Sequence, residues 1–252
     1  MPTLHDKVVL ITGAGSGIGR TTALACAAEG AKLFLADIDP AGGEETTRQV
    51  QAAGGTAQFM TADVAEADQV AAMVEEAVAA YGRLDGAVNN AGIEGVHQPL
   101  VSYPDDVFDR VMRVNVRGVW LCLKAELPVM LRQGGGAVVN IASVAGLIGA
   151  PMLSAYDASK HAVVGLTRTA AVEYAAHGVR VNCVCPSFVR TPMVERFLAE
   201  SPDMAQRLTR ASPARRLGQP DEVAQAIVWL LSGAASFVNG AALPVDGGLT
   251  AL

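Results

Sequence analysis

The chain has 252 residues and a net charge of −6, with 51% hydrophobic and only 17% charged residues. This length suits one α/β domain, and the composition supports a large buried core and argues against a disordered chain. The acidic balance, with no run of five or more Lys or Arg, disfavours a nucleic-acid or anionic-membrane surface.

Two uncharged stretches, 133–156 and 224–245, are long enough to raise the question of a membrane span. Each contains polar residues and proline, which fit a buried strand with its loop or a helix with its following strand. The opening MPTLHDKVVLITG lacks the pattern of a signal peptide. We therefore expect a soluble, cytoplasmic protein.

Short β-branched segments alternate with helical patterns along the chain. Strands are predicted at 7–12, 32–36, 56–61, 84–89, 137–142, 179–185 and 241–245, and helices include 65–81, 105–132, 154–177 and 220–231. This alternation predicts an α/β fold of Rossmann type, a doubly wound, seven-stranded parallel sheet with helices on both faces. We expect a single domain over 1–252, with a mobile substrate-covering segment at 186–219.

The four cysteines are Cys26, Cys122, Cys183 and Cys185, and their spacing does not suggest a metal site. We expect Cys183 and Cys185 to point to opposite faces of one strand, which disfavours a shared ligand site. Free buried thiols in a reducing compartment are the expected state.

A glycine-rich stretch, TGAGSGIG at 12–19, follows the first predicted strand, and a helix is expected where it ends. Gly13 permits a tight turn, Gly17 lets a pyrophosphate approach the backbone, and Gly19 allows close packing of helix and strand. The helix N-terminus offers free N–H groups to the phosphates. The alternative is a turn without a ligand; a P-loop is excluded because position 20 is Arg.

Asp37 ends the second predicted strand, eighteen positions beyond Gly19. A carboxylate at this point can accept both hydroxyls of an adenosine ribose and repels a 2′-phosphate. Ser16 is not basic, and Ile38 follows the acid where an arginine would favour NADP. We therefore predict NAD, against the alternative that Asp37 only caps a turn.

Two further strand ends are candidates for cofactor contact. Asp63-Val64 closes the third strand, where an aspartate could bond the adenine amino group, and Asn89-Asn90-Ala91-Gly92 closes the fourth, where small residues would lie beside the cofactor. Either could instead be a simple strand-end turn.

Tyr156 and Lys160 are four positions apart on a predicted helix and so lie on one face, about one turn apart. A free phenol titrates near pH ~10. A nearby cation favours the phenolate, so we expect Lys160 to lower the pKa of Tyr156 toward the working pH for acid–base catalysis. Ser143, at the carboxyl end of the fifth strand, can hydrogen-bond a substrate oxygen.

Together these motifs make the chain resemble the short-chain dehydrogenases/reductases over nearly its whole length. The shared pieces are TGAGSGIG, Asp37, Asp63-Val64, NNAG at 89–92, Asn115 in RVNVRG, Ser143, YDASK at 156–160, Asn182 in RVNCVCP and VDGG at 245–248. The resemblance implies hydride transfer between a nicotinamide and a secondary alcohol or ketone.

It also implies residue roles. Tyr156 is the expected general acid/base, Lys160 holds the nicotinamide ribose and tunes Tyr156, Ser143 orients the carbonyl, and Asn115 kinks its helix and keeps a water near Lys160. The expected cofactor contacts are Gly13, Ser16, Gly17, Ile18, Gly19, Asp37, Ile38, Asp63, Val64, Asn89, Asn90, Ala91, Gly92, Tyr156, Lys160, Pro186, Val189 and Thr191. The usual Pro-Gly after the sixth strand is Pro186-Ser187 here, which puts the contacts of 187–191 in doubt.

The candidate pocket residues are mostly apolar, which favours an apolar or alicyclic alcohol or ketone. They are Glu94, Val96, His97, Val144, Leu147, Met152, Leu153, Phe188, Met193, Phe197 and Leu198. Glu94 and His97 could grip a polar substituent or be solvated loop positions.

Several alternatives remain. One is a noncatalytic NAD-binding or NAD-sensing protein, and another is a sugar dehydrogenase of the same family. The related sugar-nucleotide epimerases and dehydratases usually add a C-terminal region, and enoyl reductases of this fold generally space the tyrosine and lysine more widely. The resemblance also implies a homotetramer.

Overall fold

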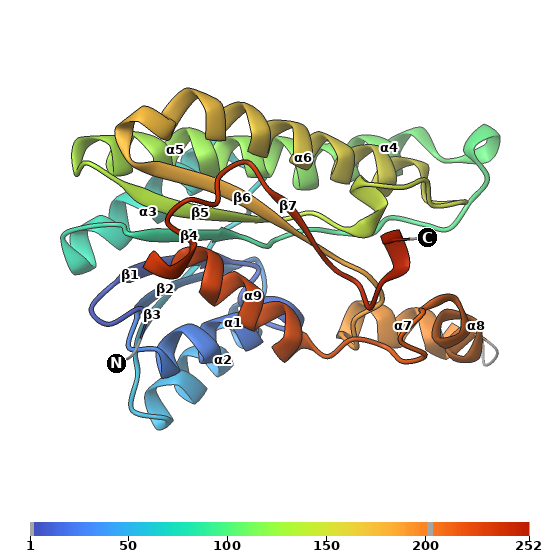
Figure 1. Ribbon diagram of the computed structural model, residues 1–252, viewed down its shortest axis with the longest axis horizontal. Coiled ribbons are helices and arrows are strands. Elements are labelled where there is room, and N and C mark those ends of the chain that lie inside the picture. Colours follow the sequence, from blue (N-terminus) through green and yellow to red (C-terminus); the bar gives the residue numbers. More distant parts are fainter. Residues whose placement is uncertain (1–2, 201–203, 252) are drawn as a thin grey trace.

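The computed structural model describes residues 3–200 and 204–251, which form a seven-stranded, all-parallel sheet (Figure 1). The strands are β1 (Val8–Thr12), β2 (Lys32–Asp37), β3 (Thr56–Thr61), β4 (Gly86–Asn89), β5 (Gly136–Ile141), β6 (Val179–Pro186) and β7 (Ala242–Val245). Their order is β3-β2-β1-β4-β5-β6-β7, so the predicted Rossmann-type doubly wound fold is confirmed. Every predicted strand end lies within two residues of the observed one.

Helices cover both faces of the sheet. They are α1 (Gly17–Ala28), α2 (Pro40–Ala52), α3 (Ala67–Tyr81), α4 (Asp105–Met112), α5 (Val119–Arg132), α6 (Ser154–Tyr174), α7 (Pro192–Glu200), α8 (Met204–Ala211) and α9 (Pro220–Leu231). In Figure 1, α3, α4, α5 and α6 lie above the sheet, and α1, α2 and α9 lie below it. No helix in the described ranges is both long enough and apolar enough to cross a bilayer.

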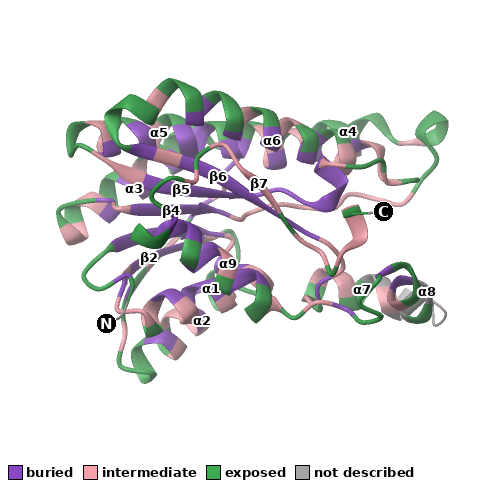
Figure 2. Cartoon of the chain, in the orientation of Figure 1, coloured by how far each residue is buried: buried purple, intermediate pink, exposed green. Residues whose placement is uncertain are grey.

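Alternate residues of the strands enter two separate cores, and Figure 2 shows the central strands buried, whereas β3 and β7 at the two edges of the sheet are partly exposed. Leu10 packs with the α3–α5–α6 layer, whereas its neighbours Val9 and Ile11 pack with α1 and α9. Cys183 and Cys185 both belong to the α3–α5–α6 core, and Val184 belongs to the other. Our expectation that the two cysteines face opposite sides is therefore wrong, because residues two apart on a strand share a face.

The helix predicted over 105–132 is interrupted. A π-helical segment, Arg113–Gly118, separates α4 from α5. Asn115 lies within it and is 1% exposed. Such wide turns displace side chains from the regular helical register and often occur at functional sites.

The segment 186–219 leaves the carboxyl end of β6 and contains α7 and α8, seen at the lower right of Figure 1. Its two ends lie side by side, because Arg190 N–H donates to the Gly218 carbonyl at 2.9 Å and Gly218 N–H donates to the Phe188 carbonyl at 2.9 Å. The segment therefore leaves the sheet and returns to its starting point, where its two ends are joined by backbone hydrogen bonds.

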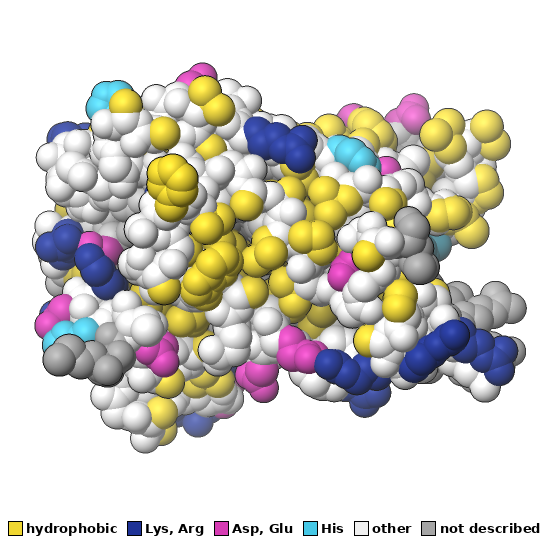
Figure 3. Space-filling view, in the orientation of Figure 1, with side chains coloured by type: hydrophobic (Ala, Val, Ile, Leu, Met, Phe, Trp, Pro, Cys, Tyr) yellow, Lys and Arg dark blue, Asp and Glu magenta, His cyan; other side chains and the backbone are white. Residues whose placement is uncertain are grey.

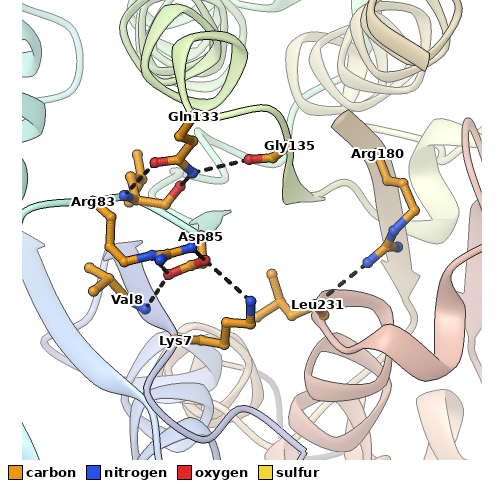
Figure 4. A network of polar contacts seen from close by, with 9 residues as sticks. Lys7, Val8, Arg83, Asp85, Gln133, Gly135, Arg180 and Leu231 are labelled. Atoms are coloured by element: carbon orange, nitrogen blue, oxygen red, sulfur yellow. Dashed lines mark hydrogen bonds and ion pairs between the residues drawn. The ribbon is translucent and has the colours of Figure 1, made fainter. Parts of the chain in front are cut away.

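The amino ends of the strands are joined by ionic and polar contacts (Figure 4). Asp85 accepts both Arg83 guanidinium N–H groups at 2.6 and 2.7 Å and the Val8 N–H at 3.0 Å, and its carboxylate lies 3.3 Å from the Lys7 ammonium. Burial alone would raise the pKa of Asp85, but Arg83, Val8 and Lys7 outweigh it and hold the pKa below its ordinary value. This edge of the sheet is therefore structural.

A polar chain crosses the core between α5 and α6. Asn89 Nδ2 donates to Glu126 Oε2 at 3.2 Å and to Asn140 Oδ1 at 3.0 Å, and Asn140 donates to Thr167 at 2.9 Å. Glu126 is 0% exposed, and burial raises its pKa to about 7. Its other oxygen and the Asn89 oxygen have no hydrogen-bond partner within the described structure.

We predict that Glu126→Gln makes stability less dependent on pH. In the unfolded chain the Glu126 carboxyl ionises near its ordinary pKa of 4.5, but in the folded chain only near 7. Because the folded state keeps this proton to a higher pH than the unfolded state does, the contribution of Glu126 to the free energy of unfolding falls as pH rises from 4.5 through 7, by on the order of 3 kcal/mol. Gln keeps the shape without ionising.

Thermal unfolding at pH 5 to 8 measures this effect. The Tm of Glu126→Gln should fall less than that of the wild type, and exposed Glu173→Gln should follow the wild type. Parallel profiles for Glu126→Gln and the wild type would contradict an ionisation at position 126.

Candidate active site

The loops after β1 and β4 meet where the strand order reverses, with β1 between β2 and β4. Asn90 Nδ2 donates to the Thr12 and Gly13 carbonyls at 3.0 and 2.9 Å. Thr12 Oγ1 in turn accepts the N–H groups of Asn90 and Ala91 at 3.1 and 3.2 Å. Ligands of open α/β sheets bind in this crevice. Thr12 was not among our site candidates, although it opens the glycine-rich motif.

The glycines of residues 13–19 have different roles. A Cβ at Gly13, whose φ is +64°, would lie 2.7 Å from the Asn90 side chain, and one at Gly19 would overlap the Gly13 carbonyl. Gly17 has φ +51°, and its nearest neighbours are the side chains of Thr191 and Pro192 at 3.5 Å. Gly13 and Gly19 therefore serve close packing of the protein, whereas Gly17 is required by its positive φ and lies beside Thr191 and Pro192.

Gly17 lies at the N-terminus of α1. Ser16 is the N-cap but makes no side-chain capping hydrogen bond, so the first N–H groups of the helix, including that of Ile18, can bind an anion. The cradle fits the pyrophosphate of a dinucleotide.

Asp37 stands at the end of β2 beside this loop. Its carboxylate accepts the Gly15 N–H at 2.7 Å and the Asp39 N–H at 2.9 Å, so it does stabilise two turns. Each carboxylate oxygen can accept further hydrogen bonds. Ile38 follows with 66% of its surface exposed and presents no cation. The position fits a ribose diol.

The remaining adenine-side candidates are engaged within the protein. Asp63 accepts the Ala65 N–H at 2.9 Å in a local turn, and Val64 is buried beside Gly118. The Asn89 side chain is committed to the Glu126 network in the core. Any cofactor contact by Asn89 is therefore left to its backbone.

Lys160, Tyr156 and Ser143 come together between α6 and the end of β5. Lys160 is 5% exposed; its Nζ donates to the Ile141 carbonyl at 2.8 Å and lies 5.4 Å from the centroid of the Tyr156 ring. Ser143 lies two residues beyond the end of β5, is 9% exposed, and is near enough to the Tyr156 phenol to affect its pKa. Tyr156 itself is partly exposed.

The protein's own groups do not lower the pKa of the phenol as we expected. Burial raises the pKa of Tyr156 to about 12; Ser143 opposes the rise and the Glu94 carboxylate adds to it. Burial also lowers the pKa of Lys160 to about 8. Because the ammonium is directed to the Ile141 carbonyl, it does not by itself offset the desolvation of the phenol.

Asn115 connects this group to the loop after β4. Its side-chain amide exchanges two hydrogen bonds of 2.8 Å with the backbone of Ile93, and its Nδ2 also donates to Ser159 Oγ at 3.0 Å. Ser159, another residue missed from the sequence, precedes Lys160 on α6. Gly92 lies between Asn115 and Lys160, since a Cβ there would be 3.2 Å from Asn115 Oδ1 and 3.6 Å from Lys160 Nζ.

The segment after β6 closes the site on its other side. Ser143 Oγ donates to the Pro186 carbonyl at 3.4 Å, Val189 is 3% exposed, and Thr191 borders Gly17. Ser187, in place of the usual glycine, donates its N–H to the Val245 carbonyl at 3.3 Å. The side chain of the pocket candidate Phe197 lies outside the described residues.

Comparison with known proteins identifies the family. A family model described as "Enoyl-(Acyl carrier protein) reductase" matches residues 13–250. The chain is 45% identical over 253 residues to 2,5-dichloro-2,5-cyclohexadiene-1,4-diol dehydrogenase of Sphingobium indicum, covering 100% of both chains. The chain belongs to the short-chain dehydrogenase/reductase family.

Two solved structures show the same fold. The crystal structure of levodione reductase superposes with a TM-score of 0.96 at 44% identity, covering 98% of this chain and 99% of that chain. NAD⁺-bound xylitol dehydrogenase gives a TM-score of 0.94 at 35% identity, covering 97% and 99%. The chain is therefore an oxidoreductase whose site is built for a nicotinamide dinucleotide.

Proposed function

We propose that the protein uses NAD to transfer a hydride between the nicotinamide and the carbinol carbon of a secondary alcohol or ketone. The convergence of Tyr156, Lys160 and Ser143 at the end of β5, beside the glycine-rich crevice, carries this proposal. When bound, the nicotinamide supplies the hydride acceptor or donor and, in its oxidised form, a positive charge.

In this proposal the protein residues handle the proton. Tyr156 exchanges it with the substrate hydroxyl, Ser143 hydrogen-bonds the same oxygen, and Lys160 adds positive charge beneath the phenol. Asn115 positions the Gly92–Ile93 backbone against Lys160. The phenol pKa of about 12 indicates that the protein alone keeps Tyr156 protonated.

The remaining cofactor contacts belong to the same proposal. Gly17 faces the pyrophosphate, Asp37 and Ile38 the adenosine ribose, Asp63 and Val64 the adenine, and Pro186, Val189 and Thr191 the nicotinamide end. Their positions around the crevice support these assignments.

An apolar or alicyclic substrate is the best-supported class. Val144, Leu147 and Leu153 flank the reacting groups in sequence and are partly or wholly buried. The Sphingobium relative acts, by its name, on a cyclohexadienediol. A sugar alcohol is a second candidate substrate, because the similar structure of xylitol dehydrogenase is named for one.

We also propose one domain over 1–252, with 186–219 covering the substrate, in a cytoplasmic homotetramer. One sheet joins all the strands, which supports the single domain. Apolar side chains gather across the middle of the face in Figure 3, over α9 and β7, and Phe237 is fully exposed. On the opposite layer, Trp120 and Val172 are 46% and 82% exposed. Two apolar faces suit two interfaces. Leu252, a further apolar candidate for such an interface, lies outside the described residues.

Tyr156→Phe removes only the hydroxyl. We predict a fall in kcat of at least about 10³-fold, because proton transfer loses its acid and base, while NAD binds within about threefold of its wild-type Kd. Steady-state rates and NAD titration measure the two effects. Tyr81→Phe, on α3, is the matched control, and unchanged turnover in Tyr156→Phe would leave a noncatalytic NAD-binding role.

Asp37→Asn removes the charge but keeps one acceptor for Gly15. We predict that the ratio of kcat/KM for NAD to that for NADP falls at least about tenfold, because a 2′-phosphate is no longer repelled. Asp39→Asn, which alters the adjacent charge, should change the ratio little. A wild-type preference for NADP would contradict the assignment of Asp37.

A further inference from the structure

The segment Gly92–Gln98 runs along the first turn of α6, and both its ends are fixed there. At one end, Gly92 lies against Lys160 and Asn115. At the other, Gln98 forms a parallel bridge with Leu153, and its N–H donates to the Met152 carbonyl at 3.0 Å. The residues between must therefore pass the side of α6 that carries Tyr156.

Two polar side chains of this segment form a pair. Glu94 Oε1 lies 3.4 Å from His97 Nε2, and the two side chains are 27% and 28% exposed. The Glu94 carboxylate is close enough to Tyr156 to raise the pKa of the phenol. Because the segment that carries the pair is held near Lys160 at one end and at Leu153 at the other, we infer that the pair lies beside the first turn of α6, which carries Tyr156.

The backbone around the pair is held in place. Val96 N–H donates to the Tyr103 hydroxyl at 3.3 Å. Gly95 has φ +86°, and a Cβ at this position would collide with the same Tyr103 hydroxyl. Met152, beyond the bridge, has φ 67°, an uncommon conformation for a residue with a side chain. A fixed backbone presents the acceptor and the imidazole at defined points, as selective recognition requires.

The pocket candidates Val144, Leu147 and Leu153, which flank the reacting groups in sequence, are apolar, so the pair supplies the polar side of the proposed substrate site. We propose that Glu94 and His97 select a neutral alicyclic substrate with a second oxygen atom, in addition to the one that reacts. Glu94 accepts a hydrogen bond from a hydroxyl at that second position, and His97 can donate to a carbonyl there. This proposal rests on the alcohol/ketone oxidoreductase function above and narrows its substrate class.

The same carboxylate discriminates against acids. A substrate carboxylate at the second position would face the Glu94 charge in a partly desolvated site, where repulsion is stronger than in water. A ring with only the reacting oxygen atom makes no hydrogen bond to Glu94 or His97. The order expected for the wild type is therefore diol, then mono-alcohol, then hydroxy acid.

The test compares kcat/KM with NAD for cyclohexane-1,4-diol, cyclohexanol and 4-hydroxycyclohexanecarboxylate. In Glu94→Met the diol-to-cyclohexanol ratio should fall at least about tenfold, because one charge-assisted hydrogen bond is lost. In Glu94→Gln, which retains an acceptor, that ratio should fall less, while the hydroxy acid-to-cyclohexanol ratio should rise at least about fivefold. His97→Phe should lower the diol-to-cyclohexanol ratio.

Glu75→Gln, exposed on α3, makes the same charge change far from the site and should leave all ratios as in the wild type. Wild-type turnover of cyclohexanol with ratios that no Glu94 or His97 variant alters would overturn this proposal and leave the proposed function intact. Failure of the wild type to oxidise any alcohol would instead overturn the proposed function, and this inference with it.

Discussion

The buried Lys160 ammonium links the helix that carries Tyr156 to the end of the strand that precedes Ser143. Its hydrogen bond to the Ile141 carbonyl fixes α6 against the end of β5, and burial lowers its pKa to about 8. A charge removed from water in this way is costly unless it is compensated. The carbonyl compensates only in part, so the site is poised to gain from an added interaction. A ribose hydroxyl of the coenzyme is a group that the ammonium could bind in this position.

The crevice follows from backbone packing at the point where the strand order reverses. A side chain at Gly13 or Gly19 would collide with Asn90 or with the loop itself, so packing within the protein sets the shape of the turn. Thr12 and Asn90 then hold the loops after β1 and β4 together. Gly17, Ser16 and Asp37 are consequently presented along one rim, and the reacting side chains lie farther along the same edge of the sheet. A preformed site of this kind spends little binding energy on ordering its own loops.

The strands and most of the site could be predicted from the sequence, because strand patterns and glycine spacing are local signals. Features set by tertiary contacts were missed. Helical periodicity predicted one unbroken helix over 105–132, and only the family resemblance implied a kink at Asn115; the structure has a π-helical turn there, in which Asn115 bonds the Ile93 backbone. Glu126 was missed although Cys122 and Met130, four residues before and after it, are buried on the same helical face. The direction of the Tyr156 pKa was wrong because the argument from spacing counted the Lys160 charge and omitted desolvation. The face assignment of Cys183 and Cys185 was an error in applying the strand period.

The central claim is that burial keeps Tyr156 protonated and that a bound, positively charged coenzyme beside Lys160 makes it acidic enough to act. Phenolate absorbance of the wild type minus that of Tyr156→Phe, titrated with and without saturating NAD⁺, measures this directly. Without NAD⁺ we expect no ionisation of Tyr156 up to about pH 10.5, as a pKa of about 12 requires. With NAD⁺ we expect its pKa to fall by at least about two units. An identical pKa in both titrations, or a phenol that already ionises near neutral pH without NAD⁺, would contradict the account.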